Sequence, residues 1–462
     1  MTIRQTSPTH VGNIVIGGGA PIRVQSMTTT DTNDTAACVA QAKRIIDAGG
    51  ELVRLTTQGR REAENMANIS AALKADGYPT PLVADVHFNA NVADIAALYC
   101  EKVRVNPGNY VDPARTFKHI DYTAEEYAEE LRKVEERFSP FLDICKEHHT
   151  AIRIGVNHGS LSDRIMSRYG DTPEGIVESC MEFLRICKKK NFSDVVLSIK
   201  ASNTVVMVQS VRLLVKAMDA EDMHYPLHLG VTEAGEGEDG RIKSAVGIGA
   251  LLTEGIGDTI RVSLSEEPEN EIPVAKKIVG FIDECASLRE NARIEDDTLY
   301  LSFNEKETED LQLKAAMAAG ALLIDGKAKN LVITNCDKPE TDLADAILQA
   351  ARVKFTKTEY ISCPGCGRTL YDLRGTIAKI KAAVAHETEV SEKPEVWKGL
   401  KIGIMGCIVN GPGEMADADY GYVGAGPNRI SLYKGKQCVE KNIPEADAVE
   451  KLLEFIKQDI TK

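Results

Sequence analysis

We base the fold that we expect for this chain on the run Ala151-Ile152-Arg153-Ile154-Gly155-Val156. It is short and rich in β-branched residues, it ends at a polar residue, and helical spacing follows, which is typical of a buried parallel strand. Eight such runs, alternating with helical segments over roughly 270 residues, predict a (β/α)8 barrel, a fold of about 250 residues. The other seven runs are Arg23–Met27, Leu52–Thr56, Pro81–Val86, Lys102–Pro107, Asp194–Ala201, Leu227–Glu233 and Thr259–Leu264.

The alternative to a closed barrel is a doubly wound open sheet, which also alternates strands with helices. The number of runs and their even spacing favour the barrel, so we predict a TIM barrel over residues 1–288. The connection between the fourth and fifth runs is long. There Thr123 and Glu126 form a capping-box pattern at the start of what we expect to be a helical hairpin.

The pattern changes after Leu288. Residues 289–356 combine acidic stretches with an apolar helical segment (Leu311–Leu323) and a strand-like run (Asn330–Thr334), which predicts a small α/β insert. Residues 357–462 contain further strand and helix candidates and predict a second compact α/β unit. The expected fold class is therefore α/β, with an N-terminal barrel, an insert and a C-terminal unit.

The composition limits the kind of protein. The chain has 462 residues, 43% of them hydrophobic, and a formal charge of −14, so a surface that coats nucleic acid is excluded. A local basic pocket is still compatible with this charge. No secretory signal follows Met1, and no apolar stretch approaches the ~20 residues of a membrane-spanning helix. We expect a soluble cytoplasmic protein without a membrane or nucleic-acid partner.

Two loops of the C-terminal unit carry cysteines in a metal-binding arrangement. Cys363 and Cys366 flank a Pro-Gly turn, and Cys407 follows a predicted strand. The C-x-x-C pair alone has three interpretations, which are a zinc clip, a redox dithiol and an iron–sulfur site. Zinc usually requires a second close pair of ligands, which is absent here. Three cysteines without an obvious fourth suit a 4Fe-4S centre with one unusual ligand.

The residue types leave the fourth ligand of that centre open. Cys336, Cys438 and Glu414 are all candidates. The remaining six cysteines fall mostly on apolar helical faces, where a cysteine is more often a core residue than a ligand. They are Cys38, Cys100, Cys145, Cys180, Cys187 and Cys285.

Five basic residues lie in or directly after the predicted strands. In a barrel such positions face the active-site mouth, and burying an unpaired charge is costly. One of them would be explained by an ion pair, but five on five strands indicate a ring that binds phosphate oxygens. The five residues are Arg54, Arg104, Arg153, Lys200 and Arg261.

Three further residues at the strand ends are open to two interpretations. Glu233 is either a proton donor or hydroxyl anchor, or else balances the charge of a neighbouring arginine. Asp85 and His87 are either part of the site or satisfied structural residues.

At these residues the sequence resembles the 4-hydroxy-3-methylbut-2-enyl diphosphate synthases, the iron–sulfur enzymes of the methylerythritol phosphate isoprenoid pathway. The resemblance rests first on Tyr360–Arg368 and Met405–Glu414, which correspond to the cluster-binding segments of that family. It extends over most of the chain through seven further segments: Val24–Thr28, Val83–Phe88, Arg104–Asn109, Arg153–Asn157, Ser198–Ser202, Leu229–Gly235 and Glu254–Ser263.

The resemblance implies a function and a set of site residues. The expected reaction is the reductive ring opening and dehydration of 2-C-methyl-D-erythritol 2,4-cyclodiphosphate to 4-hydroxy-3-methylbut-2-enyl diphosphate, with two electrons from a ferredoxin or flavodoxin. The implied ligands of a 4Fe-4S cluster are Cys363, Cys366, Cys407 and Glu414. The implied substrate-binding residues are Arg54, Arg104, Asn106, Arg153, Asn157, Lys200, Arg261 and Ser263. The candidate catalytic residues are Glu233, Glu414 and Asn410.

Some consequences of the resemblance stay open. Asn410 either bonds to the substrate or forms the turn of its Asn-Gly-Pro-Gly loop. Short members of the family build the active site between two chains, whereas longer members carry an extra barrel-like domain. Residues 289–356 are too few for a complete barrel and resemble a remnant of it. We expect a homodimer, and whether one chain completes the site is open.

Two rival functions come from other classes. A sulfite or nitrite reductase module would need a C-x-x-x-C motif, which the sequence lacks. A binding module held together by zinc would need no iron.

Overall fold

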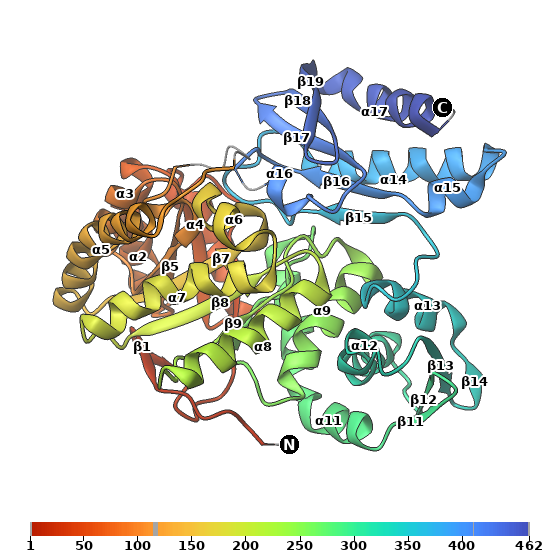
Figure 1. Cartoon of the computed structure of the whole chain (residues 1–462), viewed down its shortest axis with the longest axis horizontal. Coiled ribbons are helices and arrows are strands. Elements are labelled where there is room, and N and C mark those ends of the chain that lie inside the picture. Colours follow the sequence, from red (N-terminus) through yellow and green to blue (C-terminus); the bar gives the residue numbers. More distant parts are fainter. Residues whose placement is uncertain (1, 114–118, 410, 461–462) are drawn as a thin grey trace.

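The computed structural model describes residues 2–113, 119–409 and 411–460. Within them, eight parallel strands form one sheet in the spatial order β8-β7-β6-β5-β4-β3-β10-β9 (Figure 1). A bridge between Leu197 and Leu227 joins the two ends of this order, so the predicted barrel is confirmed. The strands are β3 (Arg23–Met27), β4 (Leu52–Thr57), β5 (Leu82–Val86), β6 (Lys102–Val105), β7 (Ala151–Asn157), β8 (Val195–Lys200), β9 (His228–Leu229) and β10 (Thr259–Ile260).

The last two strands are shorter than predicted. The ladder ends at Leu229 and at Ile260, whereas the β-branched runs continue to Glu233 and Leu264. Beyond these points the chain contacts the C-terminal unit instead: Ala234 bridges to Ser362, and the Ser265 hydroxyl donates to the Cys363 carbonyl at 3.0 Å. Contacts with a distant segment therefore replace sheet pairing here.

Helices surround the barrel. Inside its N-terminal end, a hairpin of β1 (Thr9–Val11) and β2 (Ile14–Ile16) inserts Val11 and Ile16 among buried strand residues and closes that end. Among the described residues, no helix is long and apolar enough to cross a membrane. The helices that follow the strands are α1 (Thr35–Asp47), α2 (Arg60–Ala75), α3 (Ala90–Ala96), α4 (Pro107–Tyr110), α5 (Ala124–Glu147), α6 (Asp163–Tyr169), α7 (Pro173–Lys189), α8 (Thr204–Ala220), α9 (Gly237–Leu252) and α10 (Glu271–Gly280).

The connection after β6 differs from the hairpin that we predicted. The capping box is confirmed, because the Thr123 hydroxyl accepts from the Glu126 amide at 3.1 Å and the Glu126 carboxylate accepts from the Thr123 amide at 2.8 Å. The helix that starts there, however, runs without a break through α5 to Glu147. Its apolar face, which includes Val134 and Phe138, is buried against the barrel, and this contact favours one long helix.

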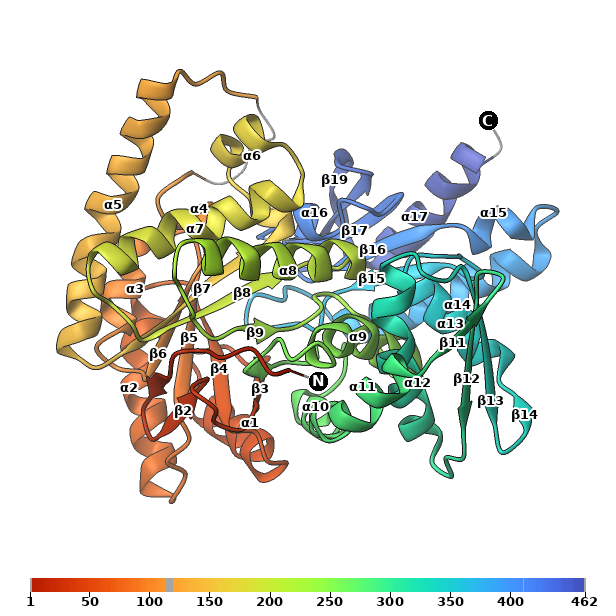
Figure 2. The ribbon, with the colours of Figure 1, turned by 60° about the horizontal axis from the view of Figure 1, so that its bottom comes forward.

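Residues 282–350 form a small α/β layer beside the barrel (Figure 2). Strands β12 and β13 are parallel, and β11 and β14 pair antiparallel at the two edges. Helix α12 packs on α9 of the barrel and shares one continuous hydrophobic core with it. The elements are α11 (Ile282–Glu290), β11 (Arg293–Glu295), β12 (Thr298–Phe303), α12 (Thr308–Ile324), β13 (Asn330–Asn335), β14 (Lys338–Pro339) and α13 (Thr341–Ala350).

The C-terminal unit is a five-stranded sheet within the described residues, with its own hydrophobic core. Strands β15, β16 and β17 are parallel, and β18 and β19 continue the sheet antiparallel. The sequence analysis missed β17, whose Tyr-Gly-Tyr-Val-Gly-Ala-Gly run has the composition of a turn. The elements are β15 (Glu359–Ser362), α14 (Leu373–Val390), α15 (Pro394–Lys398), β16 (Lys401–Met405), α16 (Gly411–Glu414), β17 (Tyr420–Gly426), β18 (Arg429–Lys434), β19 (Gln437–Pro444) and α17 (Glu445–Ile460).

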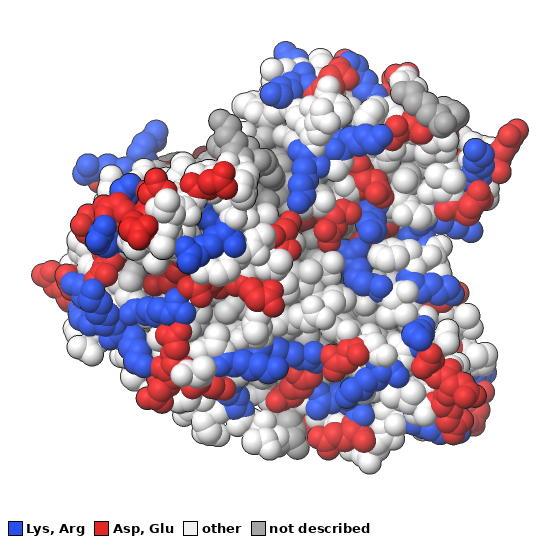
Figure 3. Space-filling model, in the orientation of Figure 1, with Lys and Arg blue, Asp and Glu red and all other residues white. Residues whose placement is uncertain are grey.

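The C-terminal unit covers the mouth of the barrel of the same chain (Figure 1). Polar contacts span this boundary, among them Lys436 to Asp171 at 3.2 Å and Lys381 to Glu236 at 2.8 Å. On the outer face in Figure 3, basic and acidic side chains are interspersed, without a continuous basic field. The cationic residues predicted to bind phosphate lie inside the molecule.

Candidate functional site

A cavity lies between the C-terminal ends of the barrel strands and the two cysteine loops. Strands β15 and β16 are parallel neighbours in the C-terminal sheet, so the cysteine loops that follow them begin at the same edge of that sheet. This edge lies above the mouth of the barrel. Both kinds of predicted residue line this one cavity. Its lining includes Arg54, Arg104, Arg153, Asn157, Lys200, Glu233, Arg261, Ser263, Cys363, Cys366 and Cys407.

The five predicted basic residues of the barrel are all buried and all line the cavity. Burial and the neighbouring Arg54 and Arg153 hold the pKa of Lys200 well below its usual range. Burial likewise lowers the pKa of Arg54 to about 10, although Asp85 opposes the shift. Because like charges share a site with little water, the cavity favours an anionic ligand.

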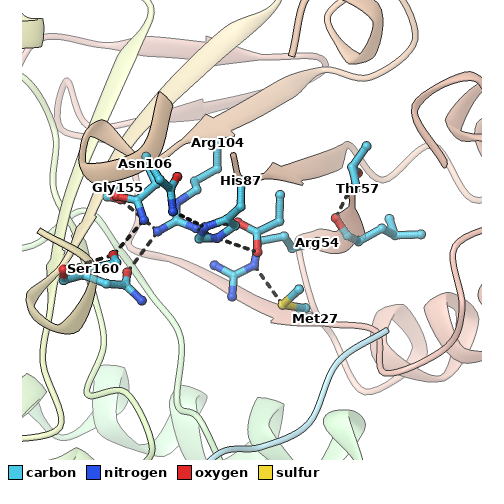
Figure 4. Close-up of polar contacts among 12 residues, drawn as sticks. Met27, Arg54, Thr57, His87, Arg104, Asn106, Gly155 and Ser160 are labelled. Atoms are coloured by element: carbon cyan, nitrogen blue, oxygen red, sulfur yellow. Dashed lines mark hydrogen bonds and ion pairs between the residues drawn. The ribbon is translucent and has the colours of Figure 1, made fainter. Parts of the chain in front are cut away.

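The basic side chains differ in how they are held. Two carboxylate oxygens of Glu271 accept from Arg261, each at 2.9 Å. Arg104 donates to Asp85 at 3.0 Å and to the Gly155 carbonyl at 2.8 Å (Figure 4). In contrast, Nε and Nη1 of Arg153 are buried without a hydrogen-bond partner. Arg153 therefore keeps donors available for a ligand.

The predicted amide residues have separate positions. The Asn157 side chain lines the cavity and accepts from Arg104 at 3.0 Å. Asn106 does not line the cavity: its amide donates to the Ser160 hydroxyl at 2.8 Å, and its carbonyl oxygen caps α4 at Gly108. The third predicted asparagine, Asn410, lies outside the described residues.

His87 and Asp85 belong to the cavity wall. Burial raises the pKa of Asp85, but Arg104 and Arg54 outweigh it and hold the pKa well below its usual value. Burial and Arg104 hold the pKa of His87 low, so its imidazole is neutral. His87 also contacts Arg104 directly and lies 3.3 Å from the Asn109 amide (Figure 4).

Two carboxyl groups are buried among these cations. Burial raises the pKa of Glu233 to about 7, although Lys200 and Lys243 oppose the shift. Burial and the Glu233 charge raise the pKa of Glu414 well above its usual range. Both oxygens of Glu414, and Oε2 of Glu233, are buried without a hydrogen-bond partner. Unsatisfied buried oxygens are costly and mark a position for a proton, a metal or a ligand.

The three cysteines of the loops meet in the cavity. The Gly406 amide donates to the sulfur of Cys363 at 3.2 Å. Burial raises the pKa of the Cys363 thiol, and the nearby charge of Glu233 adds to the shift. A bound cation would reverse this effect, since metal ligation deprotonates a thiol. The cavity wall therefore offers three sulfur ligands and the Glu233 carboxyl group, and the buried Glu414 carboxyl group lies close to charged residues of the same wall.

Among the described residues, no three Cys, His, Asp or Glu side chains are arranged to hold one ion. A multi-iron cluster distributes its ligands over several metal atoms, so its ligands need not converge on one point.

The other cysteines lie elsewhere. The six that we expected in the core are buried. Cys336 is exposed in the insert and contacts Asn304 at 3.0 Å, and Cys438 lies on β19. None of the three candidates for the fourth ligand is among the residues that line the cavity. Glu414 alone of the three is buried, and it interacts electrostatically with Glu233 and Arg104 of the cavity wall.

The sequence analysis missed Arg368. This residue follows the C-x-x-C-G motif, and its side chain reaches the barrel, where Nη2 lies 3.4 Å from the Asp85 carboxylate. In the sequence, the only indication of a role is the position of this residue next to the motif. That position does not show whether the side chain points toward the barrel.

Comparisons with known proteins agree with this architecture. A family model described as the GcpE TIM-barrel domain matches residues 6–276, and one described as the GcpE protein C-terminal domain matches residues 359–458. Among curated relatives, the "4-hydroxy-3-methylbut-2-en-1-yl diphosphate synthase (flavodoxin)" of Bacteroides thetaiotaomicron is 50% identical over 99% of this chain and 98% of its own. The protein of the same name from Porphyromonas gingivalis is 45% identical over 99% and 97%.

The first alignment extends over 609 positions, more than the 462 residues here, so that relative carries segments that this chain lacks. Neither family model covers residues 277–358. Since the barrel match alone spans more than half of the sequence and the relatives align almost from end to end, the chain belongs to the GcpE family.

Proposed function

We propose that the chain reduces 2-C-methyl-D-erythritol 2,4-cyclodiphosphate to 4-hydroxy-3-methylbut-2-enyl diphosphate and water. One observation carries the proposal: the three cysteines of the C-terminal unit and the five cations of the barrel line the same buried cavity. The same cavity could therefore hold both a redox centre and an anionic substrate. The names of the relatives, which specify this product, agree with it.

The cofactor that we propose is a 4Fe-4S cluster bound by Cys363, Cys366, Cys407 and Glu414. Three sulfur ligands in the cavity wall support it, together with the buried Glu414 carboxylate, whose neighbours include Asn157, Arg104 and Lys200 of that wall. When bound, the cluster supplies the two electrons of the reaction one at a time. A carboxylate is a harder ligand than a thiolate, which suits a position that must open for substrate.

In this proposal the barrel residues bind and orient the substrate. Arg54, Arg104, Arg153, Lys200 and Arg261 hold the two phosphate groups, and Arg153 has two donors, Nε and Nη1, without a hydrogen-bond partner in the protein. Asn157 and Ser263 add neutral hydrogen bonds. Because Asn106 is engaged with Ser160 and α4, we assign it the support of this wall rather than direct binding.

Protons are also consumed, because one substrate oxygen leaves as water. Glu233 is the residue that we propose as the donor, since its carboxyl group is buried in the cavity and holds a proton up to about pH 7. A pKa near the working pH is the property that a general acid requires. Asn410 stays a candidate for hydrogen bonding to the substrate beside the cluster.

The proposed partners follow from the same reaction. A flavodoxin, as in the names of the relatives, or a ferredoxin would supply the electrons. We further propose residues 1–288 as the substrate domain, 289–356 as the remnant of an extra domain and 357–462 as the cluster domain. The contacts of the C-terminal unit with the barrel of its own chain support a site completed within one chain. A homodimer and a cytoplasmic location stay predictions.

Anaerobic purification and turnover test the proposal. We expect a brown protein with about four irons per chain that consumes the cyclic diphosphate with an artificial electron donor. Cys407→Ser should lose iron, whereas Cys336→Ser, on an exposed cysteine in the insert, should keep it. A colourless protein with one tightly bound zinc would contradict the cluster. A fully loaded cluster without substrate consumption would contradict the reaction.

A further inference from the structure

Arg368 belongs to the C-terminal unit, but its side chain completes the wall of the barrel cavity. It lies two residues beyond Cys366 in the chain, and only 9% of it is exposed. Its guanidinium lines the same cavity as Arg54 and Arg104, and Nη2 lies 3.4 Å from an oxygen of Asp85. The ring of cations therefore has one member that comes from a different unit.

The hydrogen-bond donors of Arg368 are not used up by the protein. Nε and Nη1 are buried and have no hydrogen-bond partner. An arginine stays charged inside proteins, and a buried charged donor without a partner costs more than a neutral one. Asp85 cannot meet this demand alone, because its other oxygen already accepts from Arg104 at 3.0 Å. Nε and Nη1 are therefore available to the oxygens of a ligand.

The geometry points to a substrate-binding role: we propose that Arg368 donates Nε–H and Nη1–H to phosphate oxygens of the diphosphate substrate. This inference rests on the function proposed above and extends it to the cluster-bearing unit. Because the other five cations belong to the barrel, Arg368 is the ring member that arrives only when the C-terminal unit covers the mouth. Bound substrate then favours the docking of the C-terminal unit on the barrel, and this docking raises the affinity for substrate by the same factor.

The alternative role for Arg368 is structural. The Cys366 sulfur lies beside the guanidinium, so Arg368 could serve only to hold a thiolate of the cluster. The two roles differ in what they change. Loss of a substrate contact weakens binding and leaves the cluster intact, whereas loss of a thiolate contact changes the iron content or the electronic spectrum of the cluster.

The test compares Arg368→Met and Arg368→Lys with Arg374→Met. Arg374 is the matched control, because it also joins the C-terminal unit to the barrel, but through exposed contacts with Glu267 and the Glu266 carbonyl. Each protein is purified anaerobically with its cluster. The measurements are iron content, electron paramagnetic resonance, KM and kcat with an artificial donor, and the Kd of the cyclic diphosphate without reductant.

We expect Arg368→Met to raise KM and Kd by about 10- to 100-fold, the range for a lost hydrogen bond to a charged group. The KM and Kd of Arg368→Lys should lie between those of the unaltered protein and those of Arg368→Met, because the charge stays but the planar fork of donors is lost. Iron content and resonance spectrum should match those of the unaltered protein in both variants. Arg374→Met should bind substrate normally.

Unchanged KM and Kd in both Arg368 variants would overturn the inference, and an altered cluster spectrum with normal Kd would assign Arg368 to Cys366 instead. Should Arg368→Met fail to fold, Arg368→Lys decides alone, since it preserves charge and length. Turnover by the unaltered protein distinguishes a failure of the proposed function from a failure of the Arg368 inference. If it carries a full cluster and consumes no cyclic diphosphate, the proposed function fails; if it turns over while the Arg368 variants keep its KM, only this inference fails.

Discussion

The ammonium group of Lys243 lies 2.9 Å from a carboxylate oxygen of Glu359, and this buried ion pair joins α9 of the barrel to β15 of the C-terminal unit. The other oxygen of Glu359 accepts from Arg352 at 2.6 Å, two residues after the end of α13 in the insert. One carboxylate thus connects all three parts of the chain. Cys363 lies four residues after Glu359, so the same connection positions the first cysteine loop.

Removing one partner of this pair should destabilise the C-terminal unit strongly. We expect Glu359→Gln to cost about 3–5 kcal/mol, because it leaves the buried Lys243 ammonium unpaired, and Lys243→Met to cost less, because Arg352 still pairs with Glu359. The double variant should cost less than the sum of the two. Urea denaturation followed by the fluorescence of Trp397, the single tryptophan of the chain, measures this unit directly. The exposed pair Lys357–Asp239 is the control and should contribute about 0–1 kcal/mol.

Replacing Gly159 by alanine should prevent the C-terminal unit from seating on the barrel. A Cβ atom at Gly159 would lie 2.2 Å from the carbonyl carbon of Gly413, so backbone would have to move. Gly413 lies next to Glu414, and we expect kcat/KM to fall about 100-fold, the cost of misplacing reacting groups by about 1 Å. Small-angle scattering should show a more open particle. Gly280→Ala, where no atom lies within 4 Å, should be neutral; equal activity of the two variants would contradict the prediction.

The buried carboxyl group of Glu233 should make stability and activity depend on pH. Its pKa rises from 4.5 to about 7 in the folded protein. The stability that this proton provides is therefore full below about pH 4.5 and is lost as the pH rises toward 7, by roughly 3 kcal/mol. A proton donor is lost over the upper part of the same range, so kcat/KM should fall above about pH 7.

Glu233→Gln should remove the pH dependence of the stability and the fall of kcat/KM above about pH 7. Urea denaturation between about pH 4.5 and about pH 7.5 measures the effect on stability, and turnover between about pH 6 and about pH 8.5 measures the effect on activity. Glu238→Gln, on an exposed residue of α9, is the control. A Glu233→Gln variant with the unaltered pH profile would exclude Glu233 as the donor.

Lys102→Met should stabilise the barrel. The Lys102 ammonium is fully buried on β6 without a hydrogen-bond partner, and burial together with Arg153 and Arg54 holds its pKa well below its usual range. Because folding lowers this pKa, the folded chain holds the proton less tightly than the unfolded chain, so the residue costs stability below pH 10.5, and the cost shrinks as the pH approaches 10.5.

We expect a gain of about 1–3 kcal/mol at pH 7 for the methionine variant, measured by circular dichroism in urea. Lys74→Met, on an exposed pair with Glu101, should change stability little. A loss of stability in Lys102→Met would mean that the ammonium has a partner in solution.

Much of the fold was predictable because it is encoded locally. The run Ala151–Val156 lies within the observed β7, and the predicted run Arg23–Met27 is strand β3. The basic residues in the strands, and the cysteines after them, could be assigned to one site because parallel strands end at one edge. The early ends of β9 and β10 and the unbroken helix α5 could not be predicted, because contacts with distant segments decide them.

Residue identities and the alternation of side chains along the strands are enough to predict which charges lie at the barrel mouth, and that two loops of the C-terminal unit carry three cysteines. The packing of the two units adds that the cysteine loops cover the barrel of their own chain, that Glu414 rather than Cys336 or Cys438 is buried beside the cavity, and that Arg368 enters the ring of cations. Local sequence sets backbone conformation and side-chain alternation, whereas these outcomes depend on contacts between residues that are far apart in the chain.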